Sequence, residues 1–421
     1  MDRRAGRIMD EKGKIKKNVL IITPHYPPDG GPSAQLFCLL AEELARRSYS
    51  LKIICAVPHY PSGRVPNNYK GIKIFRENIN EVNINRVPLP SLNRKNLYCR
   101  FFQFIFMQIG FIIASLKERP DILIASNPAL QTGLAFIFFK LFKNPICIFS
   151  IHDFYPDVGV RLGIFKNKFI IKFVEFLESL CFEKADYIRV LSESFIPLVK
   201  RYEVAKEKIV LIYDWVDTEF LKPKPKINSF SVKYHLTDTF NVLYAGNIGF
   251  SQGLEIILDT ALLLSEKKDI RFIIVGEGPA KERLLETKNE KQLNNVLILP
   301  FQPKNLLPEV LSTGDILLVC LRKGMSYTSL PSKTYSILSC GRPIIGCLDE
   351  GSDSWNLILK AGAGICIDPE NPMMLSNAIL KLKNNKDLCK ELGRNGREYC
   401  IKNHSVKYAT EKFEELFNKI K

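Results

Sequence analysis

Three cationic side chains, Arg322, Lys323 and Lys333, lie within one short stretch of the chain. The first two follow an apolar run typical of a buried β-strand, and Lys333 opens a helical pattern after the Pro-Ser pair at 331–332. Pro and Ser suit the first positions of a helix, whereas a cation there opposes the helix dipole. Because small residues, cations and a helix start coincide, we expect an anion-binding site here. A surface loop with solvated charges is the alternative.

Two glycine loops follow predicted strands in the second half of the chain. In residues 246–253, Gly246 lets the backbone approach a ligand, and Gln252 offers a hydrogen-bond donor. In residues 276–278, the sequence Gly-Glu-Gly precedes another helical pattern. We expect both loops to face a bound ligand.

A Gly-Gly pair, Gly30 and Gly31, lies between the first predicted strand, Val19–Thr23, and a predicted helix, Ala34–Arg47. A glycine loop at a helix N-terminus suits a phosphate. The G-x-G-x-x-G spacing of dinucleotide-binding loops is absent, so an ordinary turn is an equal alternative.

A polar cluster, His152–Asp157, follows the predicted strand Ile146–Ile151. Open α/β sheets bind ligands at the carboxyl ends of their parallel strands. A histidine satisfied within its own loop is the alternative, but the position of His152 favours a functional role.

The elements that carry these residues alternate between strand and helix, which predicts an α/β fold with parallel, doubly wound sheets. Strand patterns at Ile72–Arg76 and Val82–Val87 extend the first sheet, and the stiff charged segment Lys222–Lys226 separates two domains. A chain of 421 residues also exceeds one ordinary core. We expect two Rossmann-like domains facing a central cleft. The predicted parts are a disordered basic arm (1–17), a first domain (18–213), a second domain (214–400) and a C-terminal helix that packs back toward the first domain (401–421).

The net charge of +16 favours acidic partners such as phospholipid, nucleic acid or a polyphosphate substrate. No nucleic-acid-binding motif accompanies it, so we expect no nucleic acid partner. The 11 cysteines show no C-x-x-C spacing, which argues against zinc and redox chemistry. Since the start of the sequence does not resemble a signal peptide, we predict a cytoplasmic protein with free thiols.

The most apolar helical pattern is Leu97–Leu116. Its glutamines and its length argue against a membrane span, and a buried core helix is one interpretation. Cations at both ends and many phenylalanines favour contact with a membrane interface. The flanking cations are Arg94, Lys95, Arg100, Lys117 and Arg119.

Six segments follow one another along the chain in a recognisable order. They are Thr23–Ser33 (TPHYPPDGGPS), Ser150–Val158 (SIHDFYPDV), Tyr213–Asp217 (YDWVD), Tyr244–Gly253 (YAGNIGFSQG), Val275–Pro279 (VGEGP) and Leu330–Pro343 (LPSKTYSILSCGRP). In this order they resemble the family 4 glycosyltransferases, retaining enzymes of the GT-B fold, which has two Rossmann-like domains. Within that family the chain looks most like bacterial transferases of the fucosamine-transferase type, which act in O-antigen or capsule assembly.

The resemblance implies a UDP-sugar donor, held mainly by the second domain, and an acceptor held by the first. It implies that His152 hydrogen-bonds the transferred sugar and that Lys333 meets the diphosphate; with Arg322 from the cationic stretch, these are the predicted catalytic residues. From the resemblance and the sequence patterns together, the residues predicted for nucleotide-sugar binding are Gly30, Gly31, Gly246, Asn247, Gln252, Gly276, Glu277, Gly278, Phe301, Gln302, Lys323, Ser332, Ser336 and Glu350.

The chain departs from the family pattern at two places. Asn247 and Gln252 stand where many members carry an arginine and a lysine, so Arg322, Lys323 and Lys333 must meet the diphosphate charge instead. The paired glutamates of the family align with Thr328 and Ser336, of which only the serine is expected to contact a ribose hydroxyl.

Breaking a glycosyl–phosphate bond leaves negative charge on the diphosphate, which fixed cations stabilise in the transition state. We therefore predict a glycosyltransferase that needs no metal and no cofactor, and no D-x-D motif argues for one. No carboxylate pair suits hydrolysis.

The predicted acceptor is an undecaprenyl-diphosphate-linked saccharide at the inner face of the plasma membrane. The predicted product belongs to O-antigen or capsule synthesis, with an N-acetylated deoxyamino sugar such as FucNAc as one possible sugar. The alternatives are a UDP-sugar 2-epimerase of the same architecture and a non-enzymatic peripheral membrane binder. An NAD enzyme would need a clear fingerprint loop and a ribose-binding acid.

Overall fold

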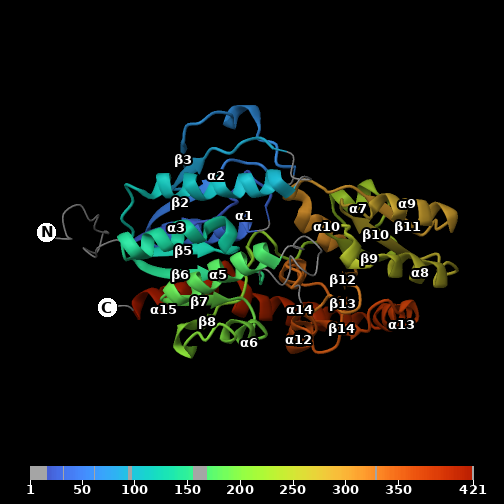
Figure 1. The fold of residues 1–421 in the computed structure, drawn as a ribbon. Coiled ribbons are helices and arrows are strands. Elements are labelled where there is room, and N and C mark those ends of the chain that lie inside the picture. The colour runs from blue at the N-terminus through green and yellow to red at the C-terminus, as the bar shows by residue number, and fades with distance from the viewer. Residues whose placement is uncertain are drawn as a thin grey trace. The chain divides into compact units, whose positions relative to one another are not determined.

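The computed structural model describes residues 17–31, 33–60, 62–92, 97–154, 168–327 and 330–419 (Figure 1). Residues 1–16 of the predicted arm, Arg94, Lys95, the 155–157 part of the His152 cluster and Thr328 lie outside them. The chain divides into two units, Met1–Asp214 with Ala409–Lys421, and Trp215–Tyr408.

The first unit is built on an eight-stranded sheet with the order β3-β4-β2-β1-β5-β6-β7-β8. All neighbouring strands are parallel except β3 and β4, which form an antiparallel pair. The strands are β1 (Asn18–Ile22), β2 (Ser50–Ala56), β3 (Phe75–Ile79), β4 (Val82–Val87), β5 (Ile122–Ser126), β6 (Ile146–Ser150), β7 (Tyr187–Val190) and β8 (Ile209–Leu211).

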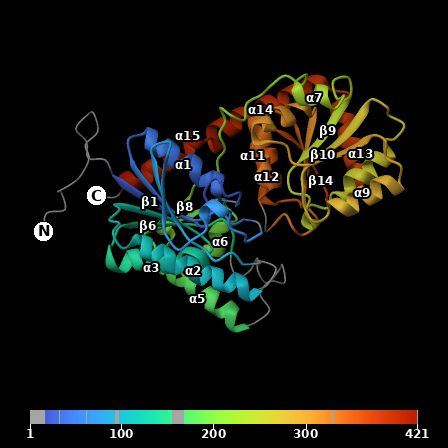
Figure 2. The same cartoon turned by 90° about the horizontal axis from the view of Figure 1, so that it is seen from above.

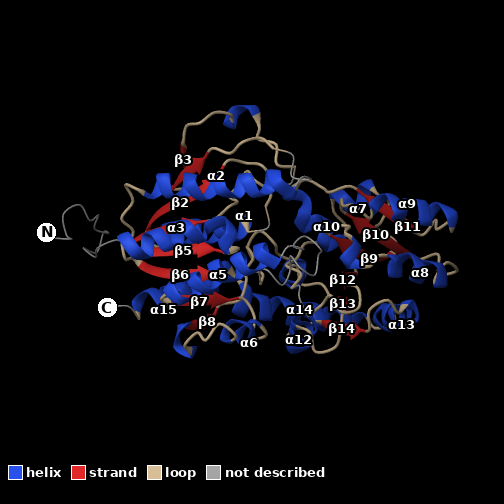
Figure 3. Cartoon of the chain, in the orientation of Figure 1, coloured by secondary structure: helices blue, strands red, loops and turns tan. Residues whose placement is uncertain are grey.

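Helices cover both faces of this sheet (Figures 2 and 3). Figure 2 shows α2, α3 and α5 side by side on one face, with α1 and α15 on the other. The helices are α1 (Ala34–Arg46), α2 (Leu97–Ser115), α3 (Ala129–Phe142), α5 (Lys168–Lys184) and α6 (Phe195–Lys200), with short 3₁₀ turns at Asn67–Tyr69 and Lys206–Lys208.

The central strands are buried on both faces, as expected for a parallel sheet whose strands read as continuous apolar runs. All residues of β5 are buried, for example. The edge is different. The predicted parallel strand Ile72–Arg76 is wrong, because β3 begins only at Phe75, Ile72 is exposed, and the pairing with β4 is antiparallel. An exposed edge strand joined by a tight turn carries little of the apolar pattern.

The second unit contains a six-stranded, fully parallel sheet with the order β11-β10-β9-β12-β13-β14. Alternate residues of β9 and β10 enter two separate apolar cores, one on each face of the sheet. The strands are β9 (Phe240–Ala245), β10 (Ile270–Val275), β11 (Val296–Leu299), β12 (Ile316–Cys320), β13 (Ile344–Cys347) and β14 (Gly364–Ile367).

Helices of the second unit follow its strands in the order of a doubly wound domain. The unit extends beyond the predicted limit at residue 400, because α14 continues to His404 and Val216 pairs with Ser405 in an isolated bridge. Its helices are α7 (Ser229–Lys233), α8 (Glu255–Leu263), α9 (Lys281–Glu290), α10 (Leu307–Thr313), α11 (Lys333–Ser339), α12 (Asp353–Lys360), α13 (Pro372–Lys383) and α14 (Lys386–His404), with 3₁₀ turns at Phe250–Gln252 and Lys304–Leu306.

The last helix, α15 (Val406–Asn418), continues from the second unit into the first. Glu414 on this helix pairs with Arg47 at 2.7 Å, at the end of α1. The ring of Phe417 meets Tyr49 edge-on, and its carbonyl accepts a hydrogen bond from Lys17 at 2.8 Å. These contacts hold the end of the chain against the first sheet and its helix α1.

Candidate active site

The ammonium group of Lys333 lies beside the turn that follows β9 in the second unit. Its Nζ donates to the hydroxyl of Tyr244 and lies 3.8 Å from the centre of that ring. The hydroxyl donates in turn to the Asn247 carbonyl at 2.6 Å. Gly246 has φ +149°, and a Cβ built on it would lie 2.9 Å from the Lys333 Nζ. The structure thus brings Lys333 to the first of the predicted second-half glycine loops.

The charge of Lys333 is poorly compensated. Burial lowers its pKa to about 7, an effect that Cys320 opposes only in part. No carboxylate pairs with this ammonium group in the part of the chain that the structure describes. An anion placed beside Lys333 would favour the charged form and raise its pKa again.

The two glycine loops of the second unit pack backbone against backbone. A Cβ on Gly276 would lie 1.9 Å from the Gly246 carbonyl oxygen, and one on Gly278 would lie 2.3 Å from that of Ile248. The amide of Ile248 donates to the Glu277 carbonyl at 2.8 Å. Any larger residue would separate the loops, so these glycines fix the shape of the turn that receives Lys333.

Side chains of these loops differ in their freedom. The Gln252 amide oxygen accepts from the Gly249 N–H at 2.9 Å, so this side chain closes its own loop. Glu277 is exposed and pairs with Lys281 at 2.7 Å. Asn247 is exposed at the surface of the loop.

Arg322 is held by carboxylates, contrary to the expectation that its charge faces an anion. Its guanidinium pairs with Glu255 at 2.8 Å and with Glu370 at 3.0 Å. It also donates to the Phe250 carbonyl at 2.7 Å. With two acidic partners it braces the loop after β9. Lys323 is exposed, and none of the ion pairs among the described residues includes it.

Asp349, which the sequence patterns did not single out, holds the turn after β12. Its carboxylate accepts from the amides of Gly324 at 2.9 Å and Ser326 at 3.1 Å. The neighbouring Glu350 is exposed, and its carbonyl accepts from the Tyr327 hydroxyl at 2.8 Å.

The other residues predicted for the second unit lie at its strand ends and on α11. Phe301 follows β11 with 55% of its surface exposed, and the Gln302 amide donates to the Pro300 carbonyl at 2.9 Å. Ser332 is exposed before α11 and Ser336 is half-buried within it. An exposed aromatic ring beside a glycine loop suits stacking on a planar ligand.

His152 of the first unit sits in a polar network at the end of β6. Its backbone N–H donates to the Asn127 side-chain oxygen at 2.8 Å, and its Nε2 lies 3.3 Å from the Ser150 hydroxyl. The edge of its ring meets Phe37, with 5.6 Å between the ring centres. Asp214 lies 4.0 Å from its Nδ1. The network fixes the plane of the imidazole.

A buried arginine stabilises this network. Arg189 on β7 pairs with Asp214 at 2.6 Å and donates to the Ile212 carbonyl at 2.7 Å. Burial lowers the pKa of His152 to about 4; Asp214 opposes this effect and Arg189 adds to it. Burial, together with Asp214, raises the pKa of Asp153 to about 6. His152 is therefore neutral near pH 7 and acts there as a hydrogen-bonding group.

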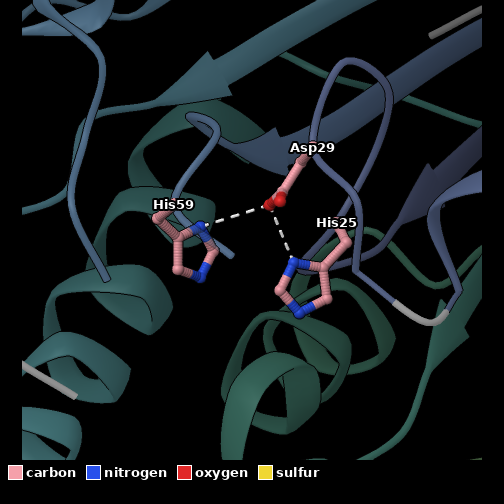
Figure 4. A group of neighbouring side chains, drawn as sticks. All are labelled: His25, Asp29 and His59. Atoms are coloured by element: carbon pink, nitrogen blue, oxygen red, sulfur yellow. Dashed lines mark hydrogen bonds and ion pairs between the residues drawn. The ribbon is translucent and has the colours of Figure 1, made fainter. Parts of the chain in front are cut away.

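Gly31 adjoins a second titratable group of the first unit, formed by His25, Asp29 and His59 (Figure 4). The Asp29 carboxylate lies 2.8 Å from the His25 Nδ1 and 3.4 Å from the His59 Nδ1. Gly31 is required for this arrangement, since a Cβ on it would lie 2.1 Å from the His25 ring, whereas Gly30 has open space around it.

Two imidazoles and a carboxylate are a donor set that suits zinc, but hydrogen bonds already engage it. The rings of His25 and His59 stack with an interplanar angle of 23°, and the Nδ1 of each ring faces the same Asp29 carboxylate. The His59 Nδ1 also lies 2.9 Å from the Val57 carbonyl, a contact that requires a proton on this nitrogen. Hydrogen bonding accounts for the cluster.

Sequence reasoning missed Tyr244, Arg189 and the His25 cluster as parts of a site. In the sequence, Tyr244 looks like an ordinary core residue of a strand. Arg189 looks like an ordinary polar residue of a strand. The charge of Arg189 within the apolar run of β7 was the available signal.

Two protein families match the chain. "Glycosyltransferase Family 4" matches residues 34–220, and "Glycosyl transferases group 1" matches residues 227–399. Among curated relatives, the putative colanic acid biosynthesis glycosyl transferase WcaI of Escherichia coli K12 is 25% identical over 84% of this chain and 89% of its own length. The probable glycosyltransferase WbjE of Pseudomonas aeruginosa is 25% identical over 77% and 81%, and the capsular polysaccharide biosynthesis glycosyltransferase CapM of Staphylococcus aureus 22% over 74% and 80%.

Solved structures share the whole fold. Sucrose-phosphate synthase from Thermosynechococcus elongatus has a TM-score of 0.73 at 16% identity, covering 96% of this chain and 99% of that one. HepE from Anabaena, in complex with UDP, has a TM-score of 0.70 at 13% identity, with 96% and 100% covered. WaaG, a glycosyltransferase of lipopolysaccharide biosynthesis, has a TM-score of 0.67 at 13% identity, covering 94% of this chain and 99% of that one. This chain belongs to the family 4 glycosyltransferases of the GT-B fold, with a family 4 first domain and a group 1 second domain.

Proposed function

We propose that this glycosyltransferase moves a sugar from a UDP-sugar to an undecaprenyl-diphosphate-linked saccharide in the assembly of a bacterial surface polysaccharide. One observation carries the donor half of the proposal. Lys333 places a partly buried, carboxylate-free ammonium group against the glycine turn at Gly246. A diphosphate is the ligand that best supplies the missing charge.

The nucleotide half of the donor fits the same edge of the second sheet. The exposed ring of Phe301 offers a stacking surface for a base. The HepE structures were solved with UDP and with UDP-glucose, which supports a UDP-sugar for a chain of the same fold.

The reaction needs two kinds of assistance, stabilisation of the leaving diphosphate and hydrogen bonding to the sugar. When the glycosyl–phosphate bond breaks, its electron pair remains on the diphosphate, and a charged Lys333 stabilises that developing charge. His152 is neutral, so it hydrogen-bonds a sugar hydroxyl without adding positive charge beside an electron-poor sugar ring. The asymmetry favours departure of the diphosphate.

The acceptor half of the proposal draws on the relatives and on the surface of the first unit. WcaI and CapM are named for the biosynthesis of colanic acid and of capsular polysaccharide. The lipid-linked acceptor of this proposal would bring the enzyme to a membrane surface.

Helices α2, α3 and α5 pack side by side in one layer (Figure 2), and we call their exposed apolar side chains the apolar face. Its side chains are exposed although they are large and hydrophobic, and such a patch marks an interaction site. They are Phe102, Ile105, Phe106, Ile109 and Ile113 on α2, Leu134, Leu141 and Phe142 on α3, and Phe169, Phe173 and Phe176 on α5.

Anionic lipid is the occupant that suits this surface. Lys117, Lys168 and Lys172 are exposed at or near the apolar face, although Glu175 is exposed there too. Aromatic side chains with flanking lysines are typical of shallow insertion between lipid headgroups. None of the described helices has the length and apolar character of a membrane-spanning segment.

Mass spectrometry tests the transfer reaction. Purified protein is incubated with UDP-glucose, UDP-N-acetylglucosamine or UDP-N-acetyl-fucosamine, with and without a bacterial polyprenyl-diphosphate saccharide extract. The proposal expects a lipid-linked product one sugar heavier together with free UDP, and only when the extract is present. Conversion of a UDP-sugar to an isomer without the extract would instead support the epimerase alternative.

Flotation with phosphatidylglycerol liposomes tests the apolar face. Replacing Phe169, Phe173 and Phe176 together by serine should leave the protein at the bottom of the gradient, whereas the unchanged protein floats. The matched control replaces Leu262 and Leu263, exposed apolar residues of the second unit, by serine. Equal flotation of all three proteins would refute the membrane assignment.

A further inference from the structure

The cluster of His25, Asp29 and His59 lies where an open parallel sheet binds ligands. Strands β1 and β2 are parallel neighbours, and the three residues follow their carboxyl ends. All three are buried, with 6%, 4% and 3% of their surfaces exposed. Figure 4 shows both imidazoles turned toward the same carboxylate.

The positions of the protons follow from the hydrogen bonds around Asp29. Its Oδ1 accepts from the Tyr60 N–H at 3.1 Å, and its Oδ2 faces the His25 Nδ1. Burial raises the pKa of Asp29, but the hydrogen bond from His25 and the electrostatic effect of both imidazoles outweigh it and hold the pKa below its usual value. The carboxylate is therefore ionised and accepts only, so the His25 Nδ1 must carry a proton.

A neutral imidazole with its proton on Nδ1 has a lone pair on Nε2. The same holds for His59, whose Nδ1 donates to the Val57 carbonyl. Among the residues that the structure describes, none donates to the His25 Nε2. Asp29 thus fixes one tautomer of His25 and leaves an acceptor nitrogen available beyond the stacked pair.

Tyr60 adds an exposed ring beside His25. Its ring meets the His25 ring edge-on with 5.5 Å between centres, and 43% of the residue is exposed. An exposed aromatic ring next to a fixed hydrogen-bond acceptor matches the chemistry of a sugar, which has an apolar C–H face and hydroxyl donors at its edge.

The loop that holds these groups is tied to the neighbouring strand β4 by hydrogen bonds. Arg86 on β4 is fully buried and donates to the carbonyls of Tyr26 at 3.2 Å and Pro27 at 2.5 Å. Gly31 packs directly against the His25 ring. A subsite on this loop would therefore be preorganised before the ligand arrives.

We infer that His25 and Tyr60 form a subsite for the acceptor saccharide, in which a sugar hydroxyl donates to the His25 Nε2 and the sugar ring lies on Tyr60. The inference rests on the proposed function, because it requires a saccharide acceptor. Asp29 and His59 position His25 and do not touch the ligand.

Nuclear magnetic resonance of the full chain, labelled at the histidine Cε1 and ring nitrogens, tests the inference directly. The chain has five histidines, so each signal is assigned by one substitution. The inference expects His25 in the Nδ1–H form, and a shift of its signal on addition of methyl glycosides of glucose, galactose, N-acetylglucosamine or N-acetylgalactosamine. The signal of the exposed His235 should not move.

Two substitutions separate recognition from folding. His25→Phe keeps a stacked ring but removes the acceptor, and Asp29→Asn allows the other tautomer of His25. Each should weaken glycoside binding about 3- to 10-fold, the value of one hydrogen bond, while the thermal shift with UDP-glucose stays unchanged. His235→Phe is the matched control.

Three results would overturn the inference. They are an Nε2–H tautomer at His25, zinc-induced loss of the His25 and His59 signals, and no glycoside effect on His25 in protein that binds UDP-glucose. If UDP-glucose also fails to bind, the proposed function itself is wrong and the inference falls with it.

Discussion

Lys333→Met should weaken binding of a UDP-sugar in a way that depends on pH. Burial lowers the pKa of Lys333 to about 7, and a bound diphosphate would raise it, so binding above that pH requires uptake of one proton. The dissociation constant of UDP-glucose should therefore rise about tenfold per pH unit between about pH 7 and pH 9. Below about pH 7 the lysine is already charged, and the profile should be flat.

The size of the loss at pH 6.5 follows from the charged hydrogen bond that disappears. Such bonds contribute about 2–3 kcal/mol, which corresponds to about 30- to 150-fold in affinity. Lys333→Met should bind UDP-glucose more weakly by this factor, with no pH slope. Isothermal titration calorimetry in buffers of different ionisation enthalpy measures both the affinity and the proton uptake.

Stability gives an independent check on the same variant. The folded-state pKa of Lys333 lies below the unfolded value of 10.5, so the unfolded chain binds more protons between about pH 7 and pH 10.5, and stability rises with pH across that window. Lys333→Met removes the free-energy cost of holding this lysine in the folded chain and should raise Tm at pH 7. Lys360→Met, an exposed control on α12, should change neither Tm nor the affinity for UDP-glucose. Unchanged UDP-glucose affinity and an unchanged pH slope in Lys333→Met would refute the assignment of the anion site.

Three further substitutions address other parts of the structure. Arg322→Ala should lower stability by about 1 kcal/mol in urea denaturation, because it releases a partly exposed pair with Glu255, and a large loss of UDP-glucose affinity with normal stability would contradict this bracing role. Gly31→Ala should cost about 1–3 kcal/mol in the same assay, because its Cβ overlaps the His25 ring. Gly30→Ala has open space and should stay within about 0.5 kcal/mol of the original chain, so equal effects of the two would be evidence against the loop geometry. His152→Ala should reduce transfer about 100-fold with UDP-glucose affinity intact, and full activity in a product assay would remove His152 from the site.

The two sheets were predictable because buried parallel strands carry continuous apolar runs. β5 and β12 are buried at every residue, and the sequence identified both. The antiparallel pairing of β3 was not predictable, because its exposed residues do not form a continuous apolar run.

Site residues were predictable only where a single segment has a recognisable local pattern, such as a helix start or a glycine loop. The helix start at Lys333 and the glycine loop at Gly246 stand out in the sequence, and the structure brings them together. The partners of Arg322 do not stand out, because Glu255 and Glu370 are distant in the sequence and meet it only in the folded chain. His25 and His59 likewise meet because β1 pairs in register with β2.

The path of α15 has a practical consequence for dissecting this enzyme. The backbone passes from the first unit to the second after Asp214 and returns before Ala409. A fragment that stops at Asp214 would therefore lack Glu414 and Phe417, the partners of Arg47 and Tyr49, and would expose one side of α1. After a single protease cut near Trp215, the two pieces should still elute together in gel filtration. The contacts of Glu414 and Phe417 on α15 with the first unit would hold them together.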